Sequence, residues 1–301
     1  MAVILHMKAV PFAYIEAILA AMLMSTVPVV IRGIEADAWV IGMFRLVFST
    51  LIVGTVALRA KKFIQLNRKQ WGGLIFIGIS FGLHWMGFFW SIKLASAQMG
   101  MISVSTYGIW VMILGALFLG HRMTRFHLVG LSMAIAGTVL TGGSIDFNAL
   151  GPYALCGFIS GVASAFFYAI LPIFHQRMTA VPMSQRTLAQ YGWAILIFLP
   201  TAPLGDWNLS AGSILGLIYL TIFGTVISHT LWIKATSALP TTVSGILYYF
   251  YVPTGCVVSY LTLGEKLTTG QIVGAVLIVV GSIVGIVGPN FRKSTGRPDP
   301  Q

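Results

Sequence analysis

The chain has 301 residues, of which 57% are hydrophobic and only 8% are charged, and its formal net charge is +11. A soluble domain usually carries about 25% charged residues, so this composition excludes an ordinary soluble protein. The basic residues stand in short loops beside apolar runs, and this placement excludes a nucleic-acid partner as the cause of the positive charge. Cys156 and Cys256 both fall within apolar runs, which gives no sign of a disulfide framework or a metal site.

Apolar runs long enough to cross a hydrocarbon core of about 30 Å follow one another along the whole chain, so the lipid bilayer is the expected surrounding. We expect ten transmembrane helices, over residues 12–31, 38–58, 71–91, 97–118, 126–142, 151–174, 187–204, 212–233, 240–262 and 268–288. The seventh is the weakest of these spans, because Pro200 and Pro203 force it to end.

The distribution of lysine and arginine predicts the orientation. With the N-terminus in the cytoplasm, fourteen of these residues lie in cytoplasmic segments and three lie outside, namely Arg32, Lys93 and Lys266. The remaining one, Arg45, lies inside the second span. This asymmetry follows the positive-inside rule and places both termini in the cytoplasm.

The chain repeats itself once. Residues 91–97 read Ser-Ile-Lys-Leu-Ala-Ser-Ala, and residues 232–238 read Trp-Ile-Lys-Ala-Thr-Ser-Ala; further on, residues 119–122 match residues 263–266. Two halves that each cross the membrane an odd number of times lie upside down relative to each other, as in many secondary transporters. The sequence therefore predicts an all-α polytopic membrane protein with ten transmembrane helices in two inverted five-helix repeats. The repeats are expected over residues 1–147 and 148–301.

These features resemble the drug/metabolite transporter superfamily, in particular its EamA-type members with ten helices, over nearly the whole chain. The resemblance rests on the duplicated Ala…Ser-Ala entry into the fourth and ninth spans, on Leu-Gly-Glu-Lys at residues 263–266, and on Arg45. The first half departs from the pattern, because His121 stands where glutamate is usual. The resemblance implies alternating-access transport of small metabolites, and the aromatic density is most similar to the YddG-type aromatic amino-acid exporters.

Ionisable residues inside spans mark functional positions, because each costs about 2.5–3.5 kcal/mol at the bilayer centre. Glu16 and Arg45 are the two candidates. Glu16 either lies in the cytoplasmic headgroup region or serves as a coupling carboxylate that faces the cavity. Arg45 either hydrogen-bonds carbonyl groups at a helix end or binds a carboxylate in bidentate fashion. The resemblance favours the structural role for Arg45, because the family uses this arginine with many substrates. Since Glu16 is the one carboxylate within a span, we expect facilitated or weakly coupled transport.

Two polar and aromatic stripes occupy matching positions of the repeat, each on one helical face. They consist of Ser103, Tyr107 and Trp110 in the fourth span, and Ser244, Tyr248 and Tyr251 in the ninth. Such stripes more often serve core packing, but tyrosine hydroxyls at membrane depth need hydrogen-bond partners, and a hydrated cavity supplies them. We therefore expect these side chains to line a substrate cavity near the midplane.

His84, Trp85 and Tyr168 are further candidates for this cavity. An intramembrane imidazole needs a hydrogen-bond partner, so His84 either joins two helices or lines the cavity. Pro253 and Gly255 are expected to form a hinge in the ninth span, because proline removes a backbone hydrogen bond.

The sequence thus favours a transporter of the bacterial inner membrane that exports small metabolites, with aromatic amino acids as the first candidate substrate. It is expected to act as a monomer or homodimer, with no cofactor. The alternatives are an EamA-type carrier of other amino acids or of drug-like cations, a passive pore, and an intramembrane hydrolase. The hydrolase reading rests on residues 78–82, which match G-x-S-x-G but lie within a predicted helix, whereas the chemistry needs a strand–turn–helix elbow.

Overall fold

The computed structural model describes residues 2–61, 63–95, 97–143, 151–264 and 266–294, and the regular elements in these ranges are all helical. The predicted boundary between the repeats, at residues 147 and 148, and Glu265 of the Leu-Gly-Glu-Lys sequence lie outside the described residues.

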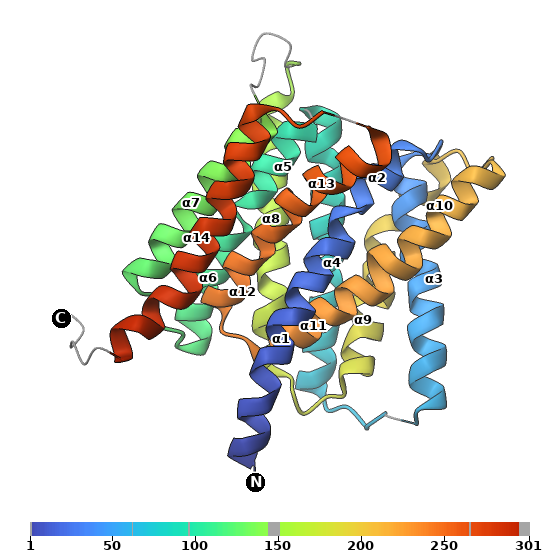
Figure 1. The fold of residues 1–301 in the computed structure, drawn as a ribbon. Coiled ribbons are helices and arrows are strands. Elements are labelled where there is room, and N and C mark those ends of the chain that lie inside the picture. The colour runs from blue at the N-terminus through green and yellow to red at the C-terminus, as the bar shows by residue number, and fades with distance from the viewer. Residues whose placement is uncertain (1, 62, 96, 144–150, 265, 295–301) are drawn as a thin grey trace.

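The helices group into five units in each half of the chain (Figure 1). Those of the first half are α1 (Ala2–Ser25) with α2 (Val27–Arg32), α3 (Ala38–Arg59), α4 (Arg68–Leu94), α5 (Ala97–Ser105) with α6 (Tyr107–Leu119), and α7 (Arg125–Gly142). Those of the second half are α8 (Ala154–Arg177), α9 (Met183–Phe198), α10 (Ala211–Thr221) with α11 (Ser228–Ala238), α12 (Thr241–Leu247) with α13 (Tyr251–Leu263), and α14 (Thr269–Ser294). A π-helical turn (Ile222–Ile227) joins α10 to α11, and a 3₁₀ turn (Tyr248–Phe250) joins α12 to α13.

Within the described residues, seven units are long and apolar enough to cross a membrane. The other three are α7, with 18 residues, α9, with 16 residues, and the interrupted unit of α12 and α13. The seventh span was expected over residues 187–204, but α9 ends at Phe198. The reason is Pro200, which has no backbone N–H to donate to the carbonyl of Leu196 four residues earlier, so the regular hydrogen-bond pattern stops there.

The packing of the units follows the repeat. In Figure 1, α7 and α14, the fifth unit of each half, lie side by side. The third unit of each half packs against the first unit of the other, as α4 does against α8 and α11 against α1. The second units, α3 and α9, also meet, and so do α6 and α12 of the fourth units. The chain therefore has the ten-helix architecture of two inverted five-helix repeats.

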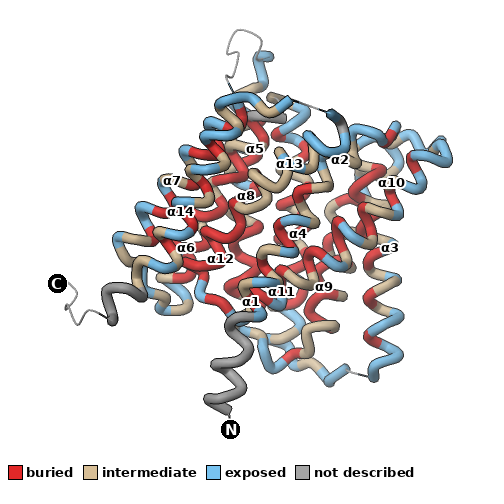
Figure 2. The backbone as a smooth tube through the Cα atoms, in the orientation of Figure 1, coloured by how far each residue is buried: buried red, intermediate tan, exposed pale blue. Residues whose placement is uncertain are grey.

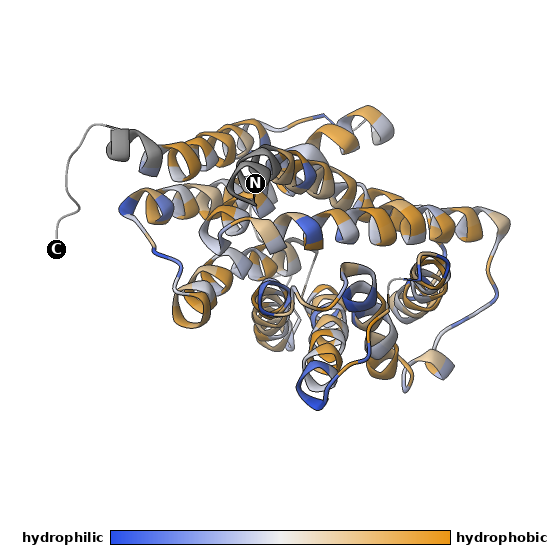
Figure 3. Ribbon diagram, turned by 90° about the horizontal axis from the view of Figure 1, so that it is seen from below, coloured by the Kyte–Doolittle hydropathy of each residue, from blue (hydrophilic) through white to orange (hydrophobic). Residues whose placement is uncertain are grey.

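The outer surface is strongly apolar. Buried residues run through the middle of the bundle in Figure 2, and hydrophobic residues cover much of the outward-facing helix surface in Figure 3. Leu117, Leu155, Leu215 and Leu261 each expose between 67% and 72% of their surface. Exposed apolar area of this extent is unfavourable in water and favourable in hydrocarbon, and it fits a multi-pass membrane protein.

Both fourth units break at the same position of the repeat. α5 ends immediately before Thr106 and Tyr107, and the 3₁₀ turn between α12 and α13 begins at the matching residue, Tyr248. In the second half, proline explains the break. Pro253 has no backbone N–H to donate to the carbonyl of Tyr249 four residues earlier, so the winding tightens there.

The G-x-S-x-G sequence at residues 78–82 lies within the continuous helix α4. A Cβ atom at Gly78 would lie 2.6 Å from the carbonyl oxygen of Ala189, and one at Gly82 would lie 2.7 Å from a side-chain carbon of Ile197. Both glycines thus allow α9 to approach α4 closely. Ser80 between them is buried, so the pattern serves helix packing.

Candidate functional site

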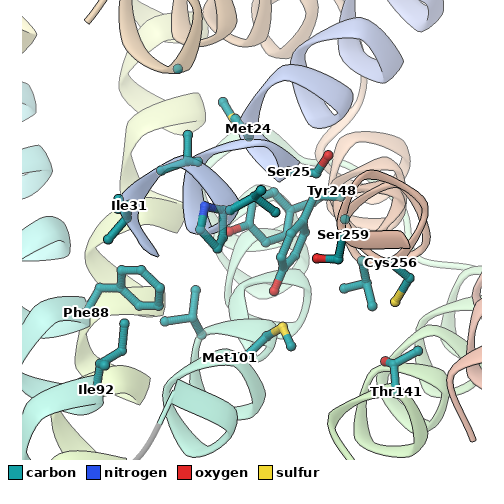
Figure 4. Close-up of a pocket in the computed structure, with 18 of the residues that line it drawn as sticks. Met24, Ser25, Ile31, Phe88, Ile92, Met101, Thr141, Tyr248, Cys256 and Ser259 are labelled. Atoms are coloured by element: carbon teal, nitrogen blue, oxygen red, sulfur yellow. The ribbon is translucent and has the colours of Figure 1, made fainter. Parts of the chain in front are cut away.

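A cavity of about 420 Å³ lies between the two halves of the bundle. Figure 4 shows side chains from α1, α2, α4, α5, α7 and α13 that converge on one space around Tyr248. Clefts of this size hold small organic molecules. Most of the lining is apolar or aromatic, and a small number of polar groups stand within it.

The cavity extends to one face of the molecule. Its lining includes Arg32 at the end of α2, Ile92 near the end of α4, Thr141 near the end of α7, and Gln271 near the start of α14. These helix ends lie at the top of Figure 1, whereas α1 begins and α14 ends at the bottom. We call the face that the cavity reaches the open face, and the face where α1 begins and α14 ends the terminal face.

At the terminal face, polar contacts join the two repeats and close the bundle. His121 Nδ1 lies 2.9 Å from Thr241 Oγ1, and the backbone N–H of Thr241 donates to the same nitrogen at 3.2 Å. Burial lowers the pKa of His121, so the ring is neutral and Nδ1 is free to accept. Arg177 of the second repeat donates to the carbonyl oxygen of Phe118 of the first at 2.6 Å. Within the second repeat, Gln176 donates to the carbonyl oxygens of Thr236 and Leu239.

Arg45 of α3 lines the cavity although only 4% of its surface is exposed. Its Nε donates to Thr225 Oγ1 at 2.9 Å, and its Nη2 donates to the carbonyl oxygen of Gly224 at 3.1 Å. Both acceptors belong to the π-helical turn between α10 and α11, whose winding departs from the regular hydrogen-bond pattern. The guanidinium carbon stands 4.2 Å from the centre of the Trp85 ring. Arg45 thus contacts the π-helical turn through one carbonyl and one hydroxyl oxygen, and the same residue also lines the cavity.

His84 of α4 both joins two helices and lines the cavity. Its Nδ1 lies 3.1 Å from the carbonyl oxygen of Ser164 and 2.8 Å from Ser164 Oγ, and that hydroxyl itself donates to the carbonyl oxygen of His84. Both oxygens near Nδ1 act as acceptors, so Nδ1 carries the proton of the neutral ring. Nε2 is then left with a lone pair that can accept a hydrogen bond.

Aromatic rings pack against one another from the cavity toward the terminal face. Tyr248 and Tyr251 line the cavity together with Trp85 and Tyr168. Tyr107 is fully buried, with its ring centre 4.4 Å from that of Tyr248 and 5.0 Å from that of Tyr168. The matched tyrosines of the two repeats, Tyr107 and Tyr248, are thus in contact; Tyr248 borders the open space and Tyr107 packs behind it.

The other residues of the predicted stripes lie outside the cavity lining in this conformation. Trp110 packs edge-on against Phe166. Ser103 donates to the carbonyl oxygen of Gly100 and lies 3.2 Å from Ser91 Oγ, while Ser244 is buried against the backbone of its own helix. These serine hydroxyls are used locally, as is common for serine in membrane helices.

Of the remaining predicted positions, one lines the cavity and the others do not. Gly255 lines the cavity, and Pro253 of the same helix is absent from the described lining. Glu16 of α1 forms an ion pair with Lys234 of α11, and Lys234 exposes 59% of its side chain. The pair joins the first unit of one repeat to the third unit of the other, and it lies away from the cavity.

Two parts of the site were not predicted from the sequence. His229 lines the cavity and contacts Phe81, with ring centres 5.1 Å apart. Its matching residue in the first repeat is Phe88, so the repeat offers no paired histidine. The other part is α2, which supplies one wall after α1 breaks at Thr26; Pro28 at the start of α2 is the signal that could have shown it.

A much smaller void lies on the terminal side of the cavity. Tyr168 and His229 border both spaces, and the void reaches His175, Gln190 and Thr236. Within the described residues, no three histidine, cysteine or acidic side chains come close enough to hold a metal ion.

Comparison with known proteins now identifies the architecture. The model of the EamA-like transporter family matches residues 11–143 and again residues 155–287. A probable amino-acid metabolite efflux pump of Salmonella typhimurium is 26% identical over 231 residues, which cover 72% of this chain and 76% of that protein.

A probable terminal-alkyne amino-acid exporter of Streptantibioticus cattleyicolor is 25% identical over 63% of this chain and 62% of its own length. A solved crystal structure with 18% sequence identity superposes with a TM-score of 0.78 over 91% of this chain and 96% of its own, which shows a shared fold. Since the family model covers both halves, in agreement with the internal repeat, the chain belongs to the EamA-like transporter family.

Proposed function

We propose that this protein exports amino acids across the bacterial inner membrane by alternating access, and that aromatic amino acids are its preferred substrates. The observation that carries the proposal is the aromatic cavity, which extends to one face while polar contacts between the repeats close the other. A carrier needs this asymmetry, because a pathway open at both faces would be a pore. The names of the relatives from Salmonella typhimurium and Streptantibioticus cattleyicolor support amino acids as the substrate class.

The rings explain how an amino acid would be held. Aromatic faces such as those of Tyr248 and Tyr251 attract an ammonium group by about 0.5–2 kcal/mol each. They also stack on an aromatic side chain for about 0.5–1.5 kcal/mol. Several modest contacts of this kind hold the substrate without a permanent ion pair and allow its release.

Topology provides the first test. The sequence assigns fourteen basic residues to the cytoplasm together with both termini, and three to the outside, so we expect the open face to lie outside the cytoplasm. A reporter that is active only outside the cytoplasm should be inactive after Gln301 and active near Asp206 or Asp146, of which Gln301 and Asp146 lie outside the described residues. The reverse pattern would overturn the orientation, and activity at both Gln301 and Asp146 would overturn the number of spans.

Transport itself is tested in proteoliposomes with a panel of radiolabelled amino acids. A carrier should show saturable uptake that unlabelled amino acid on the opposite side stimulates, and aromatic amino acids should compete best. Flux that rises without saturation would indicate the passive pore. Saturable transport of another compound class, without competition by any amino acid, would refute the proposed substrate.

Replacement of Tyr248 should weaken transport more than it weakens the fold. Tyr248→Ala removes one ring from the cavity wall, and the loss of about 0.5–1.5 kcal/mol of stacking weakens substrate binding roughly two- to tenfold. Tyr260→Ala, on the exposed side of α13, is the matched control and should transport normally. Tyr107→Ala empties a fully buried position and should lower stability by about 3–5 kcal/mol. Normal transport by Tyr248→Ala would show that the ring is packing alone.

The placement of Glu16 favours facilitated or weakly coupled export. It pairs with Lys234 away from the cavity, and the described cavity lining contains no aspartate or glutamate. A stoichiometric proton exchanger generally needs a protonatable group within its pathway, and His84 and His229 are the groups in the described lining that such an exchanger would have to use in place of a carboxylate. Glu16 is therefore assigned to holding α1 against α11.

A further inference from the structure

Within the described residues, the charged side chains that line the cavity are all basic. They are Arg45 and, near the open face, Arg32, and the lining also holds the imidazole rings of His84 and His229 but no acidic side chain. In a site with low-dielectric walls, such a set produces a positive potential. The potential attracts a negative group and opposes a ligand with a net positive charge.

Arg45 also has unused hydrogen-bond donors. A guanidinium group carries five N–H donors, and no acceptor but Thr225 Oγ1 and the carbonyl oxygen of Gly224 is found for them within the described residues. Three N–H groups are left over on a side chain that is 96% buried, and the cavity is the space that Arg45 borders. A partner for these donors must therefore enter through the cavity.

The contacts that Arg45 does make fix its orientation. Nε and Nη2 are anchored to the π-helical turn, and the Trp85 ring packs against the guanidinium group at 4.2 Å. The anchored group is a planar, rigid fork, and such a fork matches the two oxygens of a carboxylate. The structural contacts thus prepare the remaining donors for a ligand.

We propose that Arg45 binds the carboxylate of the transported molecule, and that the cavity consequently accepts carboxylate compounds and rejects drug-like cations. The inference rests on the proposed amino-acid export and deepens it, because it names the substrate group that the cavity recognises. The lone pair of His84 Nε2 and the faces of Tyr248 and Tyr251 can accept the ammonium group of a zwitterion.

The chemistry of the ligand tests this assignment. Four compounds with one side chain are compared in proteoliposomes: L-phenylalanine, its carboxamide, N-acetyl-L-phenylalanine and phenethylamine. The amino acid keeps both charges, the carboxamide and the amine lose the carboxylate, and the N-acetyl compound loses the ammonium group. We expect the wild-type protein to bind the amino acid at least about tenfold more tightly than the carboxamide, a difference that corresponds to the loss of one bidentate charged contact.

Variants of Arg45 separate ligand binding from support of the fold. Arg45→Gln should lose the preference for the amino acid over its carboxamide, whereas Arg45→Lys should keep part of it, because it retains the charge without the fork. Arg59→Gln, at the exposed end of the same helix, is the matched control and should keep the full preference. A purely structural Arg45 would lower melting temperature and transport of all ligands together and leave the ratio unchanged.

The outcomes are distinct. Equal transport of the amino acid, the carboxamide and the amine would overturn the role of Arg45 while leaving amino-acid export intact. Transport of the N-acetyl compound alone would support carboxylate recognition and overturn amino-acid export. If Arg45→Gln does not fold, the ligand series on the wild-type protein and on Arg45→Lys still decides the question. An unchanged preference of Arg45→Lys for the amino acid over its carboxamide would contradict a bidentate contact between Arg45 and the carboxylate.

Discussion

A covalent link between positions 121 and 241 is expected to abolish transport, and reduction of the link is expected to restore it. His121 follows α6 of the first repeat and Thr241 begins α12 of the second, and their side chains meet at 2.9 Å on the terminal face. An added Cβ at Gly115 would collide with the Thr241 side chain, so the closure is tight as well as polar. Alternating access requires this contact to separate in each cycle.

The experiment uses a background in which Cys156→Ser and Cys256→Ser remove the native thiols, since Cys156 is exposed and Cys256 borders the cavity. His121→Cys and Thr241→Cys are then introduced together and oxidised, or bridged with a short thiol-specific cross-linker. Each single cysteine variant, treated in the same way, is the control and should stay active. Undiminished transport by the fully cross-linked protein would show that the terminal face need not open, which would exclude alternating access through this closure.

The number and order of the helices could be predicted because most of the spans are long apolar runs, and such runs have few other stable arrangements in lipid. The breaks inside units were harder to predict. Pro28 and Pro253 mark two of them in the sequence. The π-helical turn at Gly224 and Thr225 has no such mark, since its backbone is supported by Arg45 from a helix about 180 residues earlier in the chain.

The sequence predicts that matching residues of the two repeats line the cavity equally, but in the structure the two repeats contribute differently. The two stripes have the same pattern, so the sequence treats Tyr107 and Tyr248 alike. In a bundle whose cavity reaches one face, however, equivalent residues of inverted repeats have different surroundings: Tyr248 borders the cavity and Tyr107 is fully buried behind it. The repeat in the sequence does not say which face the cavity reaches. His229 escaped prediction because its environment comes from Phe81 and Trp85 of the other repeat.

Introduction of a methyl group between α7 and α14 is expected to destabilise the whole bundle. These two helices meet through glycines: a Cβ at Gly137 would lie 2.5 Å from the carbonyl oxygen of Gly274 and 3.1 Å from the backbone nitrogen of Ile278. The obstacles are backbone atoms, so no side-chain rotation can relieve the collision, and the helices must move apart. Overpacking of this kind costs about 1–3 kcal/mol, and the separation also loses dispersion contacts along the pair.

Gly72→Ala provides the matched control for this effect. It makes the same chemical change near the start of α4, where an added Cβ meets nothing within 4 Å. The control should be neutral or slightly stabilising, because alanine is favoured over glycine in a helix by about 0.5–1 kcal/mol. Gly137→Ala should lower the melting temperature in detergent by several degrees, and Gly137→Leu should prevent stable expression. Equal melting temperatures for Gly137→Ala and Gly72→Ala would mean that α7 and α14 are not held at the observed distance. The fifth units would then have to be loosely attached helices, and the cavity wall at Thr141 and Gln271 would lack its fixed support.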